Sequence, residues 1–379
     1  MITCTANRGF PWVKKQMRAP IFTKADANPD ATSLLKALAL QMGFDLAGIA
    51  PASKADGFHH LTSWLEKGFQ GQMDYISKRA PAYQHPESLL KNVRSILMVG
   101  YNYKHQLQAD DRPAKGKVAK YAHGKDYHEV LWEKLDLLLQ EFQKSFPACQ
   151  GRGVVDTAPL LERDFARRAG LGWIGKNTML INKKAGSFMV LGALLLDMEL
   201  APDQPFAFDH CGTCTACLRA CPTEAFIGPK VLDATKCISY LTIEVKTEIP
   251  HELRGKMQDW IFGCDICQDV CPWNKKSTSA NDWNLWRNPE LESLDLVELL
   301  AMDNATFKTK FKDTPLWRRK RKGILRNACI ALGNIGKQEH LEALKKAHLE
   351  DEPLIKEAAA WAITNIHKRL GLKPNPEEC

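Results

Sequence analysis

Hydrophobic residues recur along the first half of the chain with two different periods. Residues 126–146 carry apolar side chains every three or four positions, which predicts a helix with one buried face. Residues 33–43 begin in the same way, with Ser33 as a candidate cap and Gly43 as the end. Shorter apolar runs predict strands at 44–50, 95–103 and 186–200.

Residues 151–182 combine three kinds of structure. The segment begins as a strand, turns at Thr157–Pro159, runs as a helix to about Ala169 and ends in a Gly-rich loop. Strands that alternate with helices are typical of an α/β fold. We therefore predict an α/β sandwich over residues 31–205.

Two segments near the end of the sequence repeat each other. Residues 326–336 and 357–367 match at a period of 31, with Ala, Ala, Asn and Ile at equivalent positions. The pattern predicts an α-helical HEAT-like repeat within residues 281–379. Two repeats are too few to be stable alone, so we expect them to dock on the preceding domain.

Eight of the twelve cysteines lie between residues 211 and 271. Residues 211–222 hold four of them, separated by two, two and three residues and followed by proline, which is the bacterial-ferredoxin pattern for iron–sulfur ligation. Residues 264–272 repeat the latter part of this pattern, and Cys237 can replace the missing cysteine. The spacing predicts a ferredoxin-like domain with two 4Fe–4S clusters over residues 206–280.

The same pattern predicts which cysteines share a cluster, because the fourth cysteine of each run ligates the other cluster. One cluster takes Cys211, Cys214, Cys217 and Cys271, and the other takes Cys221, Cys237, Cys264 and Cys267. Zinc is the alternative, but zinc sites usually combine two separated pairs of cysteines. Clustered cysteines in a chain without a secretory signal favour metal over disulfides, and we expect a cytoplasmic location.

Composition and charge limit the partners. No apolar run is long enough to span a membrane, and residues 1–30 are basic without a continuous apolar segment, which predicts a disordered tail. The formal net charge of +8 is compatible with a polyanionic partner. Residues 308–326 hold nine basic residues and one acid, which on a short helix would form a stripe for phosphates or a solvated face. The candidate contacts are Arg318, Arg319, Lys320, Arg321 and Lys322.

Asp156 is the candidate catalytic acid. It follows a predicted strand, and strand ends in α/β folds gather site residues. An enclosed carboxyl group there would have a raised pKa and could donate its proton, although capping of the next helix is an equally simple role. No Gly-x-Gly-x-x-Gly motif follows a predicted strand, so a Rossmann nucleotide site is not supported. The Gly-rich residues 170–177 lack the P-loop spacing and its Lys-Ser/Thr ending. The corrinoid pattern Asp-x-His-x-x-Gly fails at Leu131, which favours a helix-start or packing role for His128.

Five segments in combination resemble the epoxyqueuosine reductase family, and they are residues 120–128, 155–181, 211–226, 237–244 and 263–274. The resemblance extends from about residue 33 to 280. It implies a nitroreductase-like α/β domain that binds cobalamin base-off, without a histidine ligand. It also implies reduction of epoxyqueuosine to queuosine at the wobble position of tRNAs with GUN anticodons. The epoxide oxygen leaves as water, at the expense of two electrons and two protons.

The resemblance further implies roles for particular residues. Asp156 would be the proton donor, while reduced cobalt would either attack an epoxide carbon or pair with a substrate radical. The segments that resemble the family also imply cobalamin contacts for Asp156, Arg79, Asn177, Ser239 and Asp265. Loop hydrogen bonding is the alternative for Arg79 and Asn177. We expect a monomer that binds the anticodon stem-loop and takes electrons from an unidentified low-potential donor.

Three other classes of protein compete with this interpretation. A cobalamin-dependent reductase of small molecules, similar to the reductive dehalogenases, would share both cofactors but would need neither the basic stretch nor the helical repeat. A nucleic-acid-binding module with structural clusters would not need Asp156 at a strand end. A simple electron carrier leaves most of the chain unexplained.

Overall fold

The computed structural model describes residues 30–106, 114–280 and 288–371. The predicted disordered tail therefore lies outside the described residues, apart from residue 30. Within the described ranges, no helix is long and apolar enough to cross a membrane.

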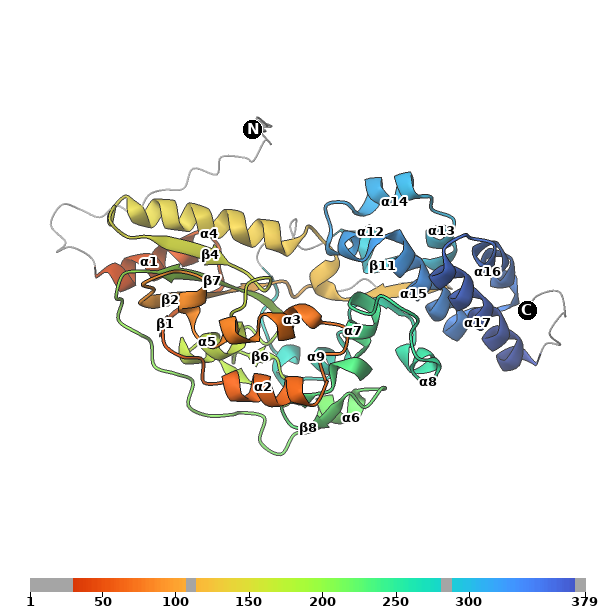
Figure 1. Ribbon diagram of the computed structural model, residues 1–379, viewed down its shortest axis with the longest axis horizontal. Helices are drawn as coiled ribbons and strands as arrows, with labels where there is room; N and C mark the ends of the chain where they lie inside the picture. The colour runs from red at the N-terminus through yellow and green to blue at the C-terminus, as the bar shows by residue number, and fades with distance from the viewer. Residues whose placement is uncertain (1–29, 107–113, 281–287, 372–379) are drawn as a thin grey trace.

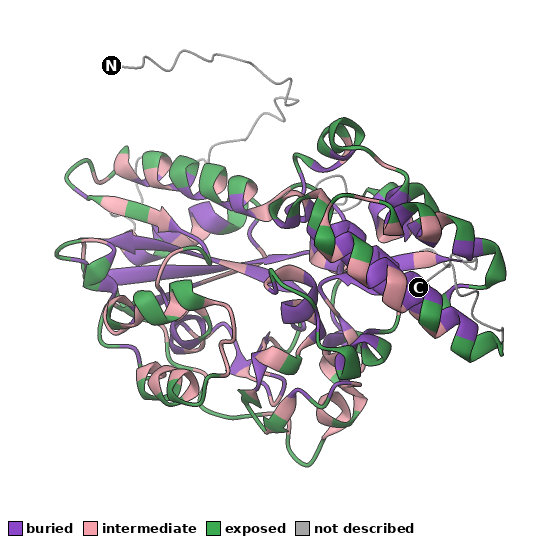
Figure 2. Cartoon of the chain, turned by 45° about the vertical axis from the view of Figure 1, so that its right-hand side comes forward, coloured by how far each residue is buried: buried purple, intermediate pink, exposed green. Residues whose placement is uncertain are grey.

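A four-stranded antiparallel sheet organises the first part of the chain (Figure 1). Its strands, in spatial order, are β1 (Leu46–Pro51), β2 (Ser95–Asn102), β7 (Met189–Leu196) and β4 (Gly151–Val154). β2 and β7 pair along their full length, from Ser95 opposite Leu196 to Asn102 opposite Met189. Both strands are buried almost throughout, as Figure 2 shows for the centre of the molecule. The three apolar runs predicted as strands are therefore confirmed.

Helices cover both faces of this sheet. On one face α1 (Ala31–Gln41) and α4 (Tyr127–Gln143) pack against Leu97 and Leu194. On the other face α5 (Glu162–Arg168) packs against Ile96. Neighbouring residues of β2 thus face opposite layers, as the pleat of a strand requires. This arrangement confirms the mixed α/β class.

Two local predictions in this region need correction. α1 begins at Ala31, so Ser33 lies inside the first turn and does not cap the helix. The predicted Gly-rich loop contains a hairpin of β5 (Trp173–Ile174) and β6 (Leu180–Ile181), whose strands are too short to leave a periodic signal. The helix end at Gly43 is confirmed, since this residue has φ of 89°.

A second sheet takes one strand from each of the three predicted domains. β3 (Lys115–Val118) pairs in parallel with β10 (Trp260–Phe262) and antiparallel with β11 (Ser293–Asp295). The segments 31–205, 206–280 and 281–379 therefore share hydrogen bonds through their backbones. The division into domains stays a prediction.

Short elements complete the chain. Before the cysteines are α2 (Phe58–Glu66) and α3 (Asp74–Lys78). The cysteine-rich segment holds α6 (Ala216–Ala220), β8 (Phe226–Gly228), β9 (Val231–Leu232), α7 (Ile238–Ile243), α8 (His251–Arg254), α9 (Ile266–Asp269) and α10 (Pro272–Lys275). The last part holds α12 (Pro289–Glu292), α13 (Leu296–Leu300), α14 (Asn304–Phe311), α15 (Lys320–Ile335), α16 (Leu341–His348) and α17 (Pro353–Leu370). Single 3-10 turns lie at Ala80–Tyr83, Pro86–Ser88, Lys120–Ala122, Ala234–Lys236, Gly255–Met257, Pro315–Arg319 and Gln338–His340.

The helical end of the chain docks on the cysteine-rich segment, as expected, through α15. The buried Arg326 guanidinium donates to the carbonyl oxygens of Leu241, Val245 and Thr247. The next residue, Asn327, donates to the carbonyls of Thr242 and Ile261. These bonds fix α15 against the end of α7 and against β10. The HEAT-like nature of this region stays a prediction.

Candidate active site and iron–sulfur centre

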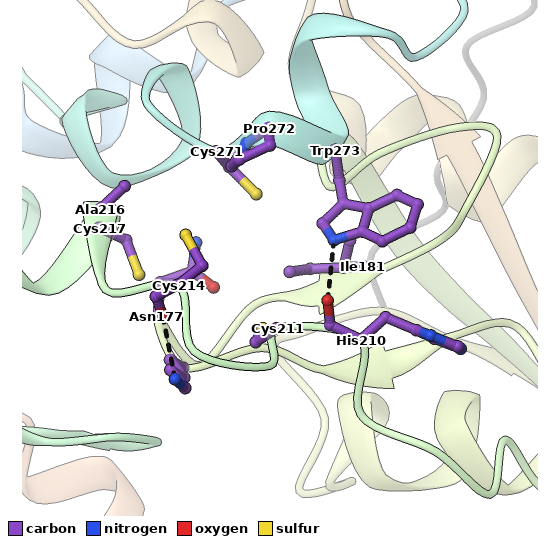
Figure 3. A pocket seen from close by; sticks show the side chains of 11 residues that line it. Asn177, Ile181, His210, Cys211, Cys214, Ala216, Cys217, Cys271, Pro272 and Trp273 are labelled. Carbon is purple, nitrogen blue, oxygen red and sulfur yellow. Dashed lines mark hydrogen bonds between the residues drawn. The ribbon is translucent and has the colours of Figure 1, made fainter.

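Four thiols surround a cavity of about 260 Å³ (Figure 3). Three belong to the ferredoxin-like run and the fourth comes from the second run, and they are Cys211, Cys214, Cys217 and Cys271. Asn177, Ile181, His210 and Trp273 complete the wall together with neighbouring residues. One thiolate for each iron, arranged around an open volume, is what a 4Fe–4S cluster requires. These residues therefore fit the first predicted cluster.

The other predicted ligands also form a group. Burial raises the pKa of the Cys264 thiol, and the nearby thiols of Cys237 and Cys221 raise it further. Burial likewise raises the pKa of Cys267, with added contributions from Cys264 and Cys237. Cys264 therefore lies near Cys221 and Cys237, and Cys267 lies near Cys237 and Cys264. In the described part of the chain, no group of three or more His, Cys, Asp or Glu side chains is placed to bind a single metal ion.

Two residues predicted to contact cobalamin lie beside these thiols. Asn177 lines the first cavity, and its Nδ2 donates to the carbonyl of Cys267 at 3.4 Å. Asp265 is 1% exposed, and its Oδ2 accepts from the backbone N–H of Lys120 at 2.8 Å. Both side chains thus form hydrogen bonds with the backbone of neighbouring segments. Their contact with cobalamin stays a prediction.

Asp156 lies on the loop between β4 and α5. α5 begins at Glu162 with Leu161 in the capping position, so the capping role considered for Asp156 is wrong. One carboxylate oxygen of Asp156 is 2.5 Å from Nε2 of His128, and the other accepts a hydrogen bond from the Tyr127 hydroxyl. The side chain remains 45% exposed. Asp156 is therefore held from one side and accessible from the other.

His128 lies between two carboxylates. Its Nδ1 is 2.6 Å from Oδ1 of Asp126, and its Nε2 faces Asp156. Asp126 also caps α4 by accepting from the backbone N–H of His128. Arg318 donates from Nε and Nη2 to Oδ2 of Asp126, at 3.0 and 2.9 Å. A chain of charge-assisted contacts thus connects Arg318 to Asp156.

These contacts decide where the proton lies. Burial raises the pKa of Asp156, but the hydrogen bond and charge of His128 outweigh it, and the pKa falls below its ordinary value. Burial lowers the pKa of His128, but the hydrogen bonds to Asp126 and Asp156 outweigh it, and that pKa rises. A single proton shared by the pair therefore lies on the imidazole. The expected raised pKa of Asp156 is wrong, because His128 supplies a cation beside it.

Sequence reasoning missed His128 as a functional residue. The signal was the Asp-Tyr-His sequence at the start of α4, which we had interpreted as a helix start. In the structure, the helix start itself brings Tyr127 and His128 to Asp156. Their rings stack with centroids 4.0 Å apart, and both side chains contact the carboxylate of Asp156.

A second carboxyl group near Asp156 has a raised pKa. Burial raises the pKa of Glu162 well above its ordinary value, and the charge of Asp156 raises it further. Its Oε1 is buried and has no hydrogen-bond partner. Burial also raises the pKa values of nearby tyrosine hydroxyls, which are those of Tyr75, Tyr83, Tyr121 and Tyr127. The surroundings of Asp156 are therefore rich in neutral hydrogen-bond donors.

Arg79 and Ser239, the other two residues predicted to contact cobalamin, lie on separate elements. Nη1 of Arg79 donates to the carbonyl of Thr157 at 3.0 Å, directly beside Asp156. Ser239 lies in the first turn of α7, two residues after Cys237, and is half-buried. Arg79 therefore makes the loop hydrogen bond considered as its alternative role. The contacts of Arg79 and Ser239 with cobalamin stay predictions.

The predicted basic stripe is divided in the structure. Arg319 is buried and donates to the carbonyl of Val245, and Arg321 forms a two-pronged ion pair with Glu350. Arg318, Lys320 and Lys322 are exposed. The prediction that these five cations belong to one exposed stripe is therefore wrong, because the 3-10 turn before α15 directs Arg319 inward. Their contact with tRNA stays a prediction.

The fold and the site define an iron–sulfur oxidoreductase in which an acid–imidazole pair lies near the cluster-binding segment. The chain is 41% identical to the epoxyqueuosine reductase of Cyclobacterium marinum, over 78% of this chain and 95% of that protein. It is 37% identical to the epoxyqueuosine reductase of Escherichia coli, over 88% and 89% of the two chains. The chain belongs to the epoxyqueuosine reductase family.

Family models and solved structures agree with this assignment. Residues 210–274 match the model described as "4Fe-4S double cluster binding domain", and residues 84–157 match "Epoxyqueuosine reductase QueG, DUF1730". A crystal structure of epoxyqueuosine reductase aligns with a TM-score of 0.83 at 33% identity, covering 92% of this chain and 97% of that one. Another, with an epoxyqueuosine-modified tRNA-Tyr stem loop, aligns with a TM-score of 0.82 at 33% identity, covering 92% and 96%.

Proposed function

We propose that this protein reduces epoxyqueuosine to queuosine at the wobble position of tRNAs with GUN anticodons. The epoxide takes up two electrons and two protons, both of its carbon–oxygen bonds break, and an alkene and water form. Family membership supports the reaction, and the tRNA stem loop bound by a related enzyme supports the substrate. The contact between Asp156 and His128 is the observation that carries the proton chemistry.

Asp156 and His128 act together as the proton donor in this proposal. Asp156 faces the substrate because its carboxylate is partly exposed, while His128 stores the proton behind it. Asp126 fixes the imidazole from the other side, and Arg318 holds Asp126. Glu162, whose pKa is raised by burial, is the nearby group proposed to supply the second proton.

The residues near Asp156 fit the cobalamin that the family implies. Glu162 offers a buried oxygen without a partner, and Ser239 offers a half-buried hydroxyl. We propose that these two residues and Arg79 hold the cofactor on the side of Asp156, with Asn177 and Asp265 on the side of the clusters. When bound, cobalamin supplies the low-potential cobalt chemistry that opens the epoxide. Two 4Fe–4S clusters, each with the four cysteines assigned above, would supply its electrons.

We propose three domains for these tasks. A nitroreductase-like α/β domain at 31–205 holds the acid, a ferredoxin-like domain at 206–280 holds the clusters, and a HEAT-like domain at 281–379 contacts tRNA. The exposed Arg318, Lys320 and Lys322 are the phosphate contacts, while Arg319 and Arg321 support the turn that presents them. Phosphate contacts position the RNA, and the splayed base is read near Asp156.

An anaerobic assay tests the proposal. Protein with reconstituted clusters is mixed with cobalamin, a strong one-electron reductant and tRNA that carries epoxyqueuosine. Nucleosides from the digested tRNA should lose the mass of one oxygen, and omission of cobalamin should abolish the loss. If tRNA is unchanged while cobalamin is bound and reduced, the small-molecule reductase becomes the better interpretation.

A further inference from the structure

The loop that carries Cys214 reaches the protein surface. Among the cysteines of the described residues, Cys214 is exposed while the other predicted ligands are buried or half-buried. Cys214 faces the 260 Å³ cavity together with Cys211, Cys217 and Cys271. A cluster in this cavity is therefore the one with a ligand loop at the protein surface.

Lysine side chains gather around this loop. Nζ of Lys176 donates to the carbonyls of Gly212 and Cys214, at 2.6 and 2.9 Å. The backbone N–H of Lys230 donates to the carbonyl of Lys176 at 2.9 Å, which brings the turn between β8 and β9 beside the loop. Lys183 lies 5.9 Å above the ring of Phe206, four residues before His210 of the cavity wall.

Acids are sparse on the same face. Residues 173–187 and 226–232 contain no Asp or Glu. Asp209 lies beside the loop, but its carboxylate already binds Lys230 at 2.8 Å and the backbone N–H of Cys211 at 2.7 Å. The positive charges of Lys176, Lys183 and Lys184 are therefore without an acidic partner there.

Exposed apolar side chains accompany these cations. Phe208 is 75% exposed in the segment that leads to Cys211, and Ile227 is 51% exposed on β8. Large exposed apolar residues within a charged rim are typical of a protein interface. We call Lys176, Lys183, Lys184, Lys230, Phe208 and Ile227 the Cys214 face.

We propose that the Cys214 face is the docking surface for an acidic one-electron carrier protein, which delivers electrons through the cluster of Cys211, Cys214, Cys217 and Cys271. The inference rests on the proposed function, because it names the partner that supplies its electrons. Each epoxide consumes two electrons, so two reduced carriers are oxidised in turn for each product. Positive charge around the accepting cluster would steer an acidic carrier and would make its association depend on salt.

Stopped-flow mixing tests the docking surface. A plant-type ferredoxin, an acidic one-electron carrier, is reduced, freed of excess reductant and mixed anaerobically with the oxidised holoprotein. The test variant combines Lys183→Glu with Lys184→Glu. The matched control combines Lys346→Glu with Lys368→Glu, two exposed lysines of α16 and α17 that give the same change in net charge.

The second-order rate constant of the test variant should fall roughly tenfold at low salt, and its salt dependence should flatten. The control should react like the parent protein. Equal rates for test variant, control and parent would overturn the docking surface. Dithionite reduces the clusters without docking, so tRNA turnover with dithionite, measured on the parent and the test variant, tests the proposed function separately.

Discussion

The imidazole of His128 lies 2.5 Å from the carboxylate of Asp156, and its other nitrogen lies 2.6 Å from Asp126. An aspartate in this position is not an isolated acid. Because the pKa of Asp156 is lowered and that of His128 is raised, a single proton shared by the pair lies on the imidazole. In the proposed reaction the acid is therefore the pair, with Asp156 as the partner in contact with solvent.

Replacement of the carboxylate should abolish proton donation but spare electron transfer. Asp156→Asn keeps the shape of the side chain and removes its capacity to pass a proton. Turnover of epoxyqueuosine tRNA should fall about 10²–10⁴-fold, the usual contribution of a general acid. Iron content and the rate of cluster reduction by dithionite are the controls and should equal those of the parent. Full turnover by this variant would show that another group protonates the oxygen.

His128→Asn should move the pH dependence of turnover toward acid. In the parent protein the pair loses its proton as pH rises through the raised pKa of His128, so turnover falls there. Without the imidazole, Asp156 must carry the proton itself. A carboxyl group releases its proton at lower pH than an imidazolium, so the alkaline limb of the profile should shift to lower pH. An unchanged limb would assign the titration to a different group.

The same group should contribute to stability in a defined pH window. The pKa of His128 is raised in the folded state, so its contribution is full below its unfolded pKa of about 6.5 and is lost as pH rises through the folded value. The pKa values of Asp126 and Asp156 are lowered, so their contribution is full above about 3.9 and is lost as pH falls through the folded values. The difference in melting temperature between the parent and His128→Asn should thus decrease both at high pH, where His128 loses its proton, and at low pH, where Asp126 and Asp156 gain one. A gap independent of pH would contradict the shifts.

Much of the fold could be predicted from the sequence because its signals are local. The spacing of hydrophobic residues predicts α4, β2 and β7 from each element's own sequence. Gly43 likewise predicts the end of α1. The pairing of β3 with β10 and β11 depends on residues far apart in the chain and had no such signal. His128 does lie in the first turn of α4, as predicted, but its contact with Asp156 had no local signal, because Asp156 comes from another element.

The basic stretch shows how far charge alone can be interpreted. Nine cations in nineteen residues predicted one surface stripe. The structure instead uses Arg319 and Arg326 to satisfy backbone carbonyls at the end of α7. Such carbonyls lack partners within their own helix, and arginine can reach several of them at once. A sequence records the charge of an arginine but not whether it faces the solvent.

Paired cysteine substitutions should reveal whether the clusters are crossed. If Cys211 and Cys271 share a cluster, the double variant Cys211→Ser with Cys271→Ser should lose about four of eight irons. The matched double variant Cys211→Ser with Cys221→Ser should lose nearly all of them, because it damages both clusters. Iron and sulfide analysis after anaerobic reconstitution makes the comparison. The opposite result, with greater loss in the first variant, would mean that each run of cysteines binds its own cluster.

Two neighbouring cations of α15 should separate stability from tRNA binding. Arg321 is 15% exposed, donates to the carbonyl of Met302 and pairs with Glu350 at 2.5 and 3.0 Å. Arg321→Gln leaves these acceptors without their charged partner, so the free energy of unfolding should fall by about 1–3 kcal/mol.

Lys322 is 54% exposed and lies 3.9 Å from Glu352, a contact too weak to stabilise the fold appreciably. Lys322→Gln should therefore keep the stability of the parent but weaken tRNA binding, and the slope of log affinity against log salt should decrease by about one. Denaturant titration and salt-dependent tRNA binding on both variants make the comparison. Normal tRNA affinity for Lys322→Gln, Lys320→Gln and their combination would contradict this prediction. The start of α15 would then have only a structural role, and the phosphate contacts would lie elsewhere.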